Sequence, residues 1–324
     1  MSISRVIAEM FLGAAVACAS AQDVTVRVWW HGHHGIYHGQ ARADLGHVAT
    51  AWEREFAKLH PEVHFVNAEV GDEAALGGLY AGVADVALMD RPPLAIEVDG
   101  YQQGAGHDPT GAAIGTGSLR TPQDAPALAL LVAEGNPLRE ISLTQIDAVF
   151  DADHRRGLER VHTWGDLGLT GAWATRPVHL YGFGINEEQS FLFERDVMKG
   201  SQKWREGLHE FDRAALISAA VAKDADGIGI ASMDGVDAGV RVLAVKGDIG
   251  GAVQPSLDTL RAGTYPLART LYAYFNTGAT EQTRKTVQEF LEYAVSAEGQ
   301  AAVQANGYVA LSADAAKQSR EALR

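Results

Sequence analysis

The first hundred residues alternate between two hydrophobic patterns. Val24, Val26 and Val28 alternate with polar neighbours, as in a half-buried strand. From Val48 to Phe56 the apolar side chains recur every three or four positions instead, as on one face of a helix. These patterns predict strands over 24–30, 63–70 and 84–93, and helices over 45–59 and 72–80. Strands and helices in this order predict an α/β fold, with mostly parallel sheets that carry helices on both faces.

The rest of the chain repeats these patterns less regularly. Residues 94–122 are rich in glycine and weakly periodic, so we expect only loops and short strands there. Asn186, with Gln189 three residues later, predicts a capping box at the start of a further helix. The other predicted elements are strands over 127–133 and 265–276 and helices over 142–150 and 287–295, with Ser142 as the cap of the first of these helices.

The composition is that of an ordinary globular protein of 324 residues, 47% hydrophobic and 21% charged. A net charge of −14 argues against nucleic acid and against anionic membrane surfaces as partners. The one cysteine, Cys18, excludes a disulfide framework.

The N-terminus has the pattern of a secretory signal. Arg5 precedes an apolar run, and the run ends in a small-x-small cleavage pattern at residues 19–21. We therefore expect residues 1–21 to be removed and the mature protein to be periplasmic. Ala15 stands where a lipoprotein signal has a large aliphatic residue, so lipid attachment at Cys18 is the less favoured alternative.

No motif points to an enzyme. The sequence lacks a nucleophile elbow, a P-loop, a zinc-protease helix motif and a dinucleotide-binding fingerprint. We expect a binding protein without catalytic residues.

Four segments, in the same order, resemble one known family. The first is YPLARTLYAYFN at 265–276. The second is the segment 287–311, in which a predicted helix leads into SAEGQ and then GYVAL. The other two are TWGDLGL from residue 163 and KDADGIGIAS at 223–232. They are similar to the periplasmic phosphate-binding proteins, the solute receptors of phosphate ABC transporters. The resemblance implies a two-lobed type II periplasmic-binding-protein fold that holds its ligand between the lobes.

The resemblance also implies an organisation and partners. We expect lobe I at 22–122 and 268–324, and lobe II at 123–267. It implies a monomer that needs no cofactor and presents its closed form to an ABC transporter permease or a sensor.

In this family, phosphate is held by helix N-termini, an arginine and an aspartate that accepts the ligand's proton. Asp85 in ADVALMDR matches the family's aspartate motif, and Arg91 is expected to add positive charge nearby. Asp85 as a turn carboxylate and Arg91 in an ordinary salt bridge are the alternatives. The loop with Gly71 takes the place of the family's second phosphate loop, but carries acids beside it.

The loop that corresponds to the family's first phosphate loop is rich in histidine. His31, Gly32, His33 and His34 lie where relatives carry Ser, Thr and Gly. Glycine admits backbone amides, and histidine donates to an oxyanion. The alternatives are solvated loop histidines, with one or two lining the cleft, and a divalent metal bound by these histidines and nearby carboxylates.

A third loop departs most from the family. Asn186, Glu187 and Gln189 stand, with Glu188, where relatives carry an arginine and a Ser-Gly-Thr run. Carboxylates at a helix N-terminus use the positive end that an anion would otherwise bind, and they repel a dianion. We therefore expect a small oxyanion such as phosphate as ligand, with a metal or another polar solute as the alternative.

Overall fold

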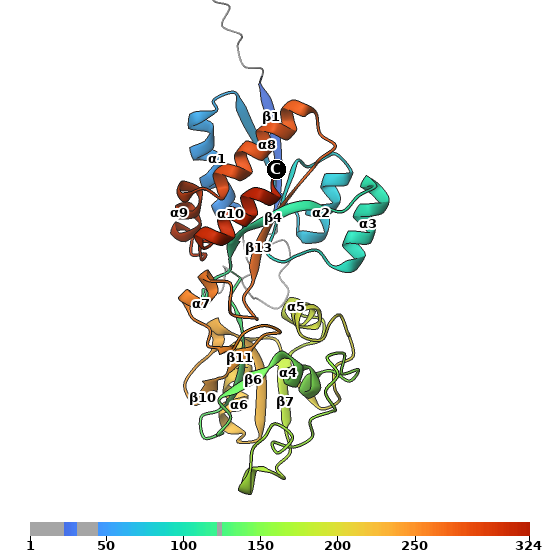
Figure 1. The fold of residues 1–324 in the computed structure, drawn as a ribbon, viewed down its shortest axis with the longest axis vertical. Helices are drawn as coiled ribbons and strands as arrows, with labels where there is room; N and C mark the ends of the chain where they lie inside the picture. The colour runs from blue at the N-terminus through green and yellow to red at the C-terminus, as the bar shows by residue number, and fades with distance from the viewer. Residues whose placement is uncertain (1–22, 31–44, 122–124) are drawn as a thin grey trace, which may run out of the picture.

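The computed structural model describes residues 23–30, 45–121 and 125–324, which form two α/β halves joined end to end (Figure 1). We call the upper half lobe I and the lower half lobe II. The predicted signal at 1–21 lies outside the described residues.

Lobe I contains a five-stranded sheet in the order β2-β1-β3-β13-β4. Strands β1, β2 and β3 run parallel, and β13 pairs antiparallel with both β3 and β4. The late strand β13 therefore closes the sheet that the first strands begin. The strands are β1 Val24–Trp30, β2 Val63–Glu69, β3 Val86–Met89, β4 Thr110–Thr116 and β13 Thr270–Phe275.

Helices cover both faces of this sheet (Figure 1). Trp52 and Phe56 of α1 pack with Phe290 of α8 on one face, and Leu76 of α2 packs with Tyr101 of α3 on the other. The helices are α1 Gly46–Leu59, α2 Asp72–Tyr80, α3 Ala95–Ala105, α8 Glu281–Ala294, α9 Ala297–Ala305 and α10 Ala313–Ala322.

Lobe II repeats the plan with the sheet order β10-β5-β9-β7-β8. The pairs β7–β8 and β7–β9 are parallel, and β5 pairs antiparallel with β9 and β10. A small second sheet has the order β12-β11-β6. The strands are β5 Leu128–Ala133, β6 Glu140–Ser142, β7 His179–Phe183, β8 Leu208–Phe211, β9 Gly227–Ser232, β10 Val240–Val242, β11 Ala244–Lys246 and β12 Ala252–Val253; the helices are α4 Leu143–Phe150, α5 Glu188–Asp196, α6 Ala214–Lys223 and α7 Leu257–Arg261, with 3₁₀ turns at Gly171–Trp173 and Met233–Gly235.

The predicted α/β class is confirmed. The strand at 24–30 and the helix at 72–80 have the predicted bounds, and Ser142 caps α4 by accepting the Gln145 N–H at 3.1 Å. Each large sheet is mixed, because two antiparallel pairings join the two parallel ones. Both lobes thus have parallel strands whose carboxyl ends share one edge.

Two local predictions were wrong. Residues 94–122 contain the whole of α3 and β4. Helix α3 was not predicted because it lies on the surface and buries only Tyr101, so its sequence has no periodic stripe of apolar residues. The capping box at Asn186 and Gln189 is absent: the turn closed by the Glu187 N–H on the Gly184 carbonyl (2.9 Å) delays the helix, so α5 begins at Glu188 without a side-chain cap.

The chain passes between the lobes twice, in two segments that lie side by side. The Gly117 N–H donates to the Arg269 carbonyl at 2.6 Å, and the Leu128 N–H donates to the Leu267 carbonyl at 3.0 Å. The Tyr265 hydroxyl also donates to the Leu128 carbonyl at 2.8 Å. Arg269 is therefore fixed at the junction of the lobes. Within the described ranges, no helix has the length and apolar character needed to cross a membrane.

Candidate functional site

The candidate site lies where strand ends from both lobes meet. In lobe I, β3 ends at Met89 and the next residue is Asp90. In lobe II, β7 runs into the turn that starts α5, which lies at the top of that lobe, beside lobe I (Figure 1). Open α/β sheets bind ligands outside the carboxyl ends of their strands. We therefore expect a ligand site at the junction.

One arginine joins the two lobes at this junction. Nη2 of Arg269 bonds both Oδ2 of Asp90 and Oε1 of Glu188. Asp90 is 1% exposed and Arg269 8%, whereas the Glu188 side chain keeps 18% of its surface. Asp90 belongs to lobe I and Glu188 opens α5 of lobe II. We call these three residues the junction triad.

The junction triad carries one positive and two negative charges. Arginine keeps its proton at any physiological pH, so the guanidinium is a permanent cation. Two carboxylates on one cation leave a net charge of −1 at neutral pH. Such a group attracts a ligand that offers both an anionic oxygen to Arg269 and protons to the carboxylates.

The neighbouring arginines are already held by acids. Arg91 is buried and forms a two-pronged pair with Glu97, with both N–O distances at 2.7 Å. Arg195 pairs with Asp196 at 2.6 Å and also donates to the Pro92 carbonyl across the junction at 3.4 Å. Arg91 thus makes an ordinary ion pair, the alternative reading of its sequence context.

Asp85 lies at the opposite end of β3 from Asp90. Its Oδ1 accepts from Nη2 of Arg27 at 2.7 Å, and its Oδ2 accepts from Nε at 2.8 Å and from the Arg27 backbone N–H at 2.9 Å. Both oxygens therefore hold β1 to β3. The aspartate of this motif that reaches the junction is Asp90.

Gly71 holds the start of α2 beside the end of β1. It is the N-cap of α2 with a φ of 95°, a conformation that costs glycine little and other residues much. The Val70 and Gly71 N–H groups both point to the Trp30 carbonyl, at 3.1 and 3.4 Å. The start of α2 is thus held at the end of β1.

The histidine loop itself, with His31, Gly32, His33 and His34, lies outside the described residues. Within the residues that the structure does place, no three His, Cys, Asp or Glu side chains form a group that could hold a metal. The metal alternative therefore gains no support from the described part.

Of the third loop, only Glu188 joins the triad. Asn186 is exposed, and Glu187 and Gln189 are half-buried at the start of α5. Ser190 Oγ donates back to the Gly184 carbonyl at 2.9 Å, which fixes the turn. Glu187 and Glu188 are adjacent but differ in role. Glu187 is the N-cap of α5 through its backbone, whereas the side chain of Glu188 faces the junction.

Sequence reasoning missed Asp90 and Arg269. Asp90 had a usable signal, because it follows directly on the apolar strand at its carboxyl end. Arg269 stands inside the YPLARTLY motif, 179 residues away from Asp90. Only the pairing of β13 with β3 brings the two together.

A pocket of about 430 Å³ opens between the lobes, at the start of α3 and along α5. Leu94, Ala95 and Ile96 line it from lobe I, and Phe191 and Arg195 of α5 line it from lobe II.

Known proteins agree with this architecture. The sequence profile of the PBP superfamily domain matches residues 44–298. A phosphate-binding protein PstS of Pseudomonas aeruginosa is 31% identical over 278 residues, 85% of this chain and 83% of its own length. A PstS protein of Staphylococcus epidermidis is 22% identical over 279 residues, 85% of this chain and 79% of its own length.

Solved structures show the same fold at low identity. The PstS structure from Borrelia burgdorferi has a TM-score of 0.62 at 11% identity, with 89% of this chain and 99% of that chain covered. A phosphate transport receptor from Vibrio cholerae has a TM-score of 0.56 at 15% identity, with 88% and 99% covered. With a profile over residues 44–298 and a relative that is 31% identical, the chain belongs to the PBP superfamily and, within it, to the periplasmic phosphate-binding protein family, whose members are transporter receptors and not enzymes.

Proposed function

We propose that this protein is a periplasmic solute receptor that binds a protonated oxyanion, phosphate first, at the junction triad. One observation carries the proposal: a single buried arginine is bonded by carboxylates from both lobes. A guanidinium binds tetrahedral oxyanions through its fork of N–H groups. The relatives' names, phosphate-binding protein, support the same ligand.

The two carboxylates favour a ligand that carries protons. Asp90 and Glu188 accept hydrogen bonds and donate none when ionised. A dihydrogen phosphate ion offers two P–OH groups to them and its charged oxygens to Arg269. Sulfate offers no proton at neutral pH, so its negative charge would be repelled by both carboxylates without a hydrogen bond to offset the repulsion.

Glu188 also sets how the ligand enters. In the structure its carboxylate occupies a nitrogen of Arg269. The oxyanion must share or displace that contact, so Glu188 competes with the ligand. This competition rejects weakly held anions, in the way that repulsive groups give a receptor its selectivity.

The lobes and the export signal belong to the same proposal. We take 22–122 with 268–324 as one lobe and 123–267 as the other, and the paired segments around Gly117 and Leu267 as the hinge. Cleavage after residue 21 would release the receptor to the periplasm, where a transporter permease or sensor would meet its closed form.

Titration calorimetry of the mature protein tests this function. We expect phosphate to bind and sulfate at the same concentration not to bind. Arg269→Gln should weaken phosphate binding by roughly a hundredfold, because a charge-assisted contact in a buried site is lost. Arg261→Gln, on the exposed face of α7, is the matched control and should bind as the wild type does.

Equal binding of phosphate and sulfate would contradict the role of the carboxylates. Unchanged phosphate binding in Arg269→Gln, with the same melting temperature, would remove the triad as the site.

A further inference from the structure

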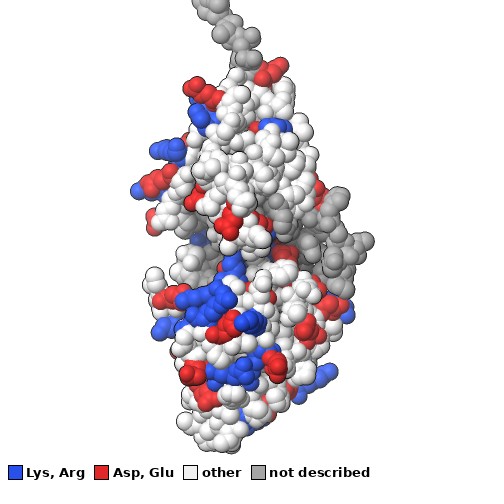
Figure 2. All heavy atoms as spheres, turned by 90° about the vertical axis from the view of Figure 1, so that its right-hand side faces the viewer, with Lys and Arg blue, Asp and Glu red and all other residues white. Residues whose placement is uncertain are grey.

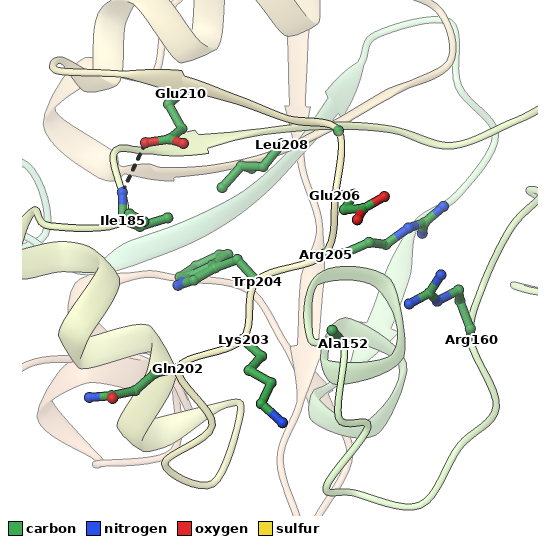
Figure 3. A pocket seen from close by; sticks show the side chains of 11 residues that line it. Ala152, Arg160, Ile185, Gln202, Lys203, Trp204, Arg205, Glu206, Leu208 and Glu210 are labelled. Carbon is green, nitrogen blue, oxygen red and sulfur yellow. Dashed lines mark hydrogen bonds between the residues drawn. The ribbon is translucent and has the colours of Figure 1, made fainter.

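A second groove lies in lobe II, away from the junction triad. It has a volume of about 610 Å³ and runs between the edge strand β8 and the chain segment 202–207 that leads into it (Figure 3). A volume between roughly 300 and 1,000 Å³ is usual for small-molecule sites.

Two arginines meet at one end of the groove. The guanidinium groups of Arg160 and Arg205 lie next to each other there (Figure 3). Arg205 is fixed from behind, because its Nη1 donates to the Val161 carbonyl at 2.5 Å and to the Val149 carbonyl at 3.3 Å. Burial, and then the positive charge of Arg160, lower the pKa of Arg205. The two cations therefore repel each other without a ligand.

Arg160 has no hydrogen bond or ion pair within the described ranges of the chain. The other cation on the groove, Lys203, differs, because its Nζ pairs with Asp153 at 3.0 Å. Figure 2 shows basic side chains gathered on lobe II on the face it presents, although the whole protein carries −14. An anion at the arginine pair would relieve the repulsion between two like charges.

The middle of the groove is apolar and contains an aromatic ring. The Trp204 ring lies opposite Ile185 and Leu208 (Figure 3). Its back face stacks on Phe193, with centroids 5.3 Å apart, and its Nε1 donates to Glu194 at 2.5 Å. Trp204 is thus held in place and offers its other face to the groove. A flat ring fits between an indole and aliphatic side chains.

We propose that this groove is a second ligand site, which takes a small planar aromatic monoanion such as an aromatic carboxylate. The ring would lie on Trp204, and the acidic group would lie at Arg160 and Arg205. The proposal goes beyond the solute receptor at the junction and does not depend on it.

The charge of the groove selects a monoanion. Glu206 lies at the same end as the arginine pair and forms no ion pair with a described residue. Two guanidiniums and this carboxylate leave one net positive charge. At the other end, Glu210 accepts the Ile185 N–H at 3.1 Å, and its negative charge repels the acidic group of a ligand from that end. A singly charged carboxylate or sulfonate therefore matches better than a dianion.

Calorimetry with three probes on the mature protein tests the site. We expect 2-naphthoate to bind one site, and naphthalene-2-methanol, which has the ring without the charge, to bind roughly tenfold more weakly. Inorganic phosphate, with the charge and no ring, should not displace 2-naphthoate. Displacement by phosphate that Arg269→Gln abolishes would place the probe at the junction triad and overturn the proposal.

Two surface variants locate the probe. Arg160→Gln should weaken 2-naphthoate binding roughly fivefold, and Ile185→Ala should weaken it roughly threefold. Both side chains are exposed, so the fold should be retained. Arg261→Gln is again the matched control. No binding of 2-naphthoate by the wild type, or equal binding by wild type and both variants, would refute the site.

Discussion

Glu188, the first residue of α5, is bonded to the guanidinium of Arg269 on the segment that enters lobe I. An acid of one lobe thus occupies the cation that an oxyanion would need. This contact bridges the two lobes, and in the proposed function it makes Glu188 a competitor for the ligand.

The first prediction separates two adjacent acids. Glu188→Thr should raise phosphate affinity about tenfold, because it frees a nitrogen of Arg269 and removes one negative charge. Glu187→Ser should leave the affinity unchanged, since Glu187 acts through its backbone as the N-cap of α5. Calorimetric titration of phosphate at low salt measures both, where the repulsion is screened least. Equal gains in the two variants would show that Glu188 has no special role.

A second prediction concerns pH. Phosphate affinity should fall between about pH 6 and pH 8, because the ligand loses the proton that a carboxylate of the triad accepts. Glu188→Gln should flatten this dependence, since the amide also donates to an unprotonated oxygen. Calorimetry at three pH values is the measurement, and an affinity that rises with pH would contradict the protonated ligand.

The third prediction concerns lobe closure. Phosphate should reduce the radius of gyration by bending the paired hinge segments. Without ligand, Glu188→Ala should enlarge the molecule, because it removes the bridge to Arg269, whereas Glu187→Ala should not. Small-angle X-ray scattering measures these changes. A radius unaffected by ligand and by Glu188→Ala would count against hinged lobes.

A fourth prediction follows from a carboxyl group buried in lobe II. Asp147 of α4 is fully buried, and burial raises its pKa, helped by the nearby charge of Asp151. The folded protein then holds this proton more tightly than the unfolded chain does. The free energy of unfolding contributed by Asp147 is therefore present in acid and is lost as the pH rises through the folded-state pKa.

Asp147→Asn should remove that loss. At pH 7 we expect a gain of about 1 kcal/mol in the free energy of unfolding, and near pH 4 a smaller one. The amide oxygen can still accept the Arg156 N–H, which Asp147 accepts at 2.9 Å. Asp166→Asn is the opposite control. Backbone N–H donors lower the pKa of Asp166, so the loss of this carboxylate should reduce the free energy of unfolding at pH 7. Urea unfolding at both pH values decides it.

The metal alternative has its own measurement. We expect zinc not to raise the melting temperature of chelator-treated protein, because Arg269 already neutralises part of the carboxylate charge at the junction. If zinc does stabilise the protein, the triple change of His31, His33 and His34 to Ala should abolish the effect, and the effect should weaken toward pH 5.5.

Local pattern predicted the elements better than the site. The strand at 24–30 and the helix at 72–80 came from periodicity, which depends only on near neighbours in the chain. Asp85 and Asp90 flank the same short strand, and periodicity cannot tell which end faces a ligand. That choice depends on the direction of β3 relative to the other lobe. Arg269 needed the antiparallel pairing of β13 with β3, which no local signal carries.

Helix α5 connects the two proposed ligand sites. Glu188 begins it at the junction, and Glu194 in its last turns holds Trp204 of the outer groove. If release of Glu188 displaces the helix as a rigid unit, the shape of the groove changes with it. Thermodynamic reciprocity then requires that an occupant of the groove alter the affinity at the junction by the same factor as the junction ligand alters the affinity of the groove.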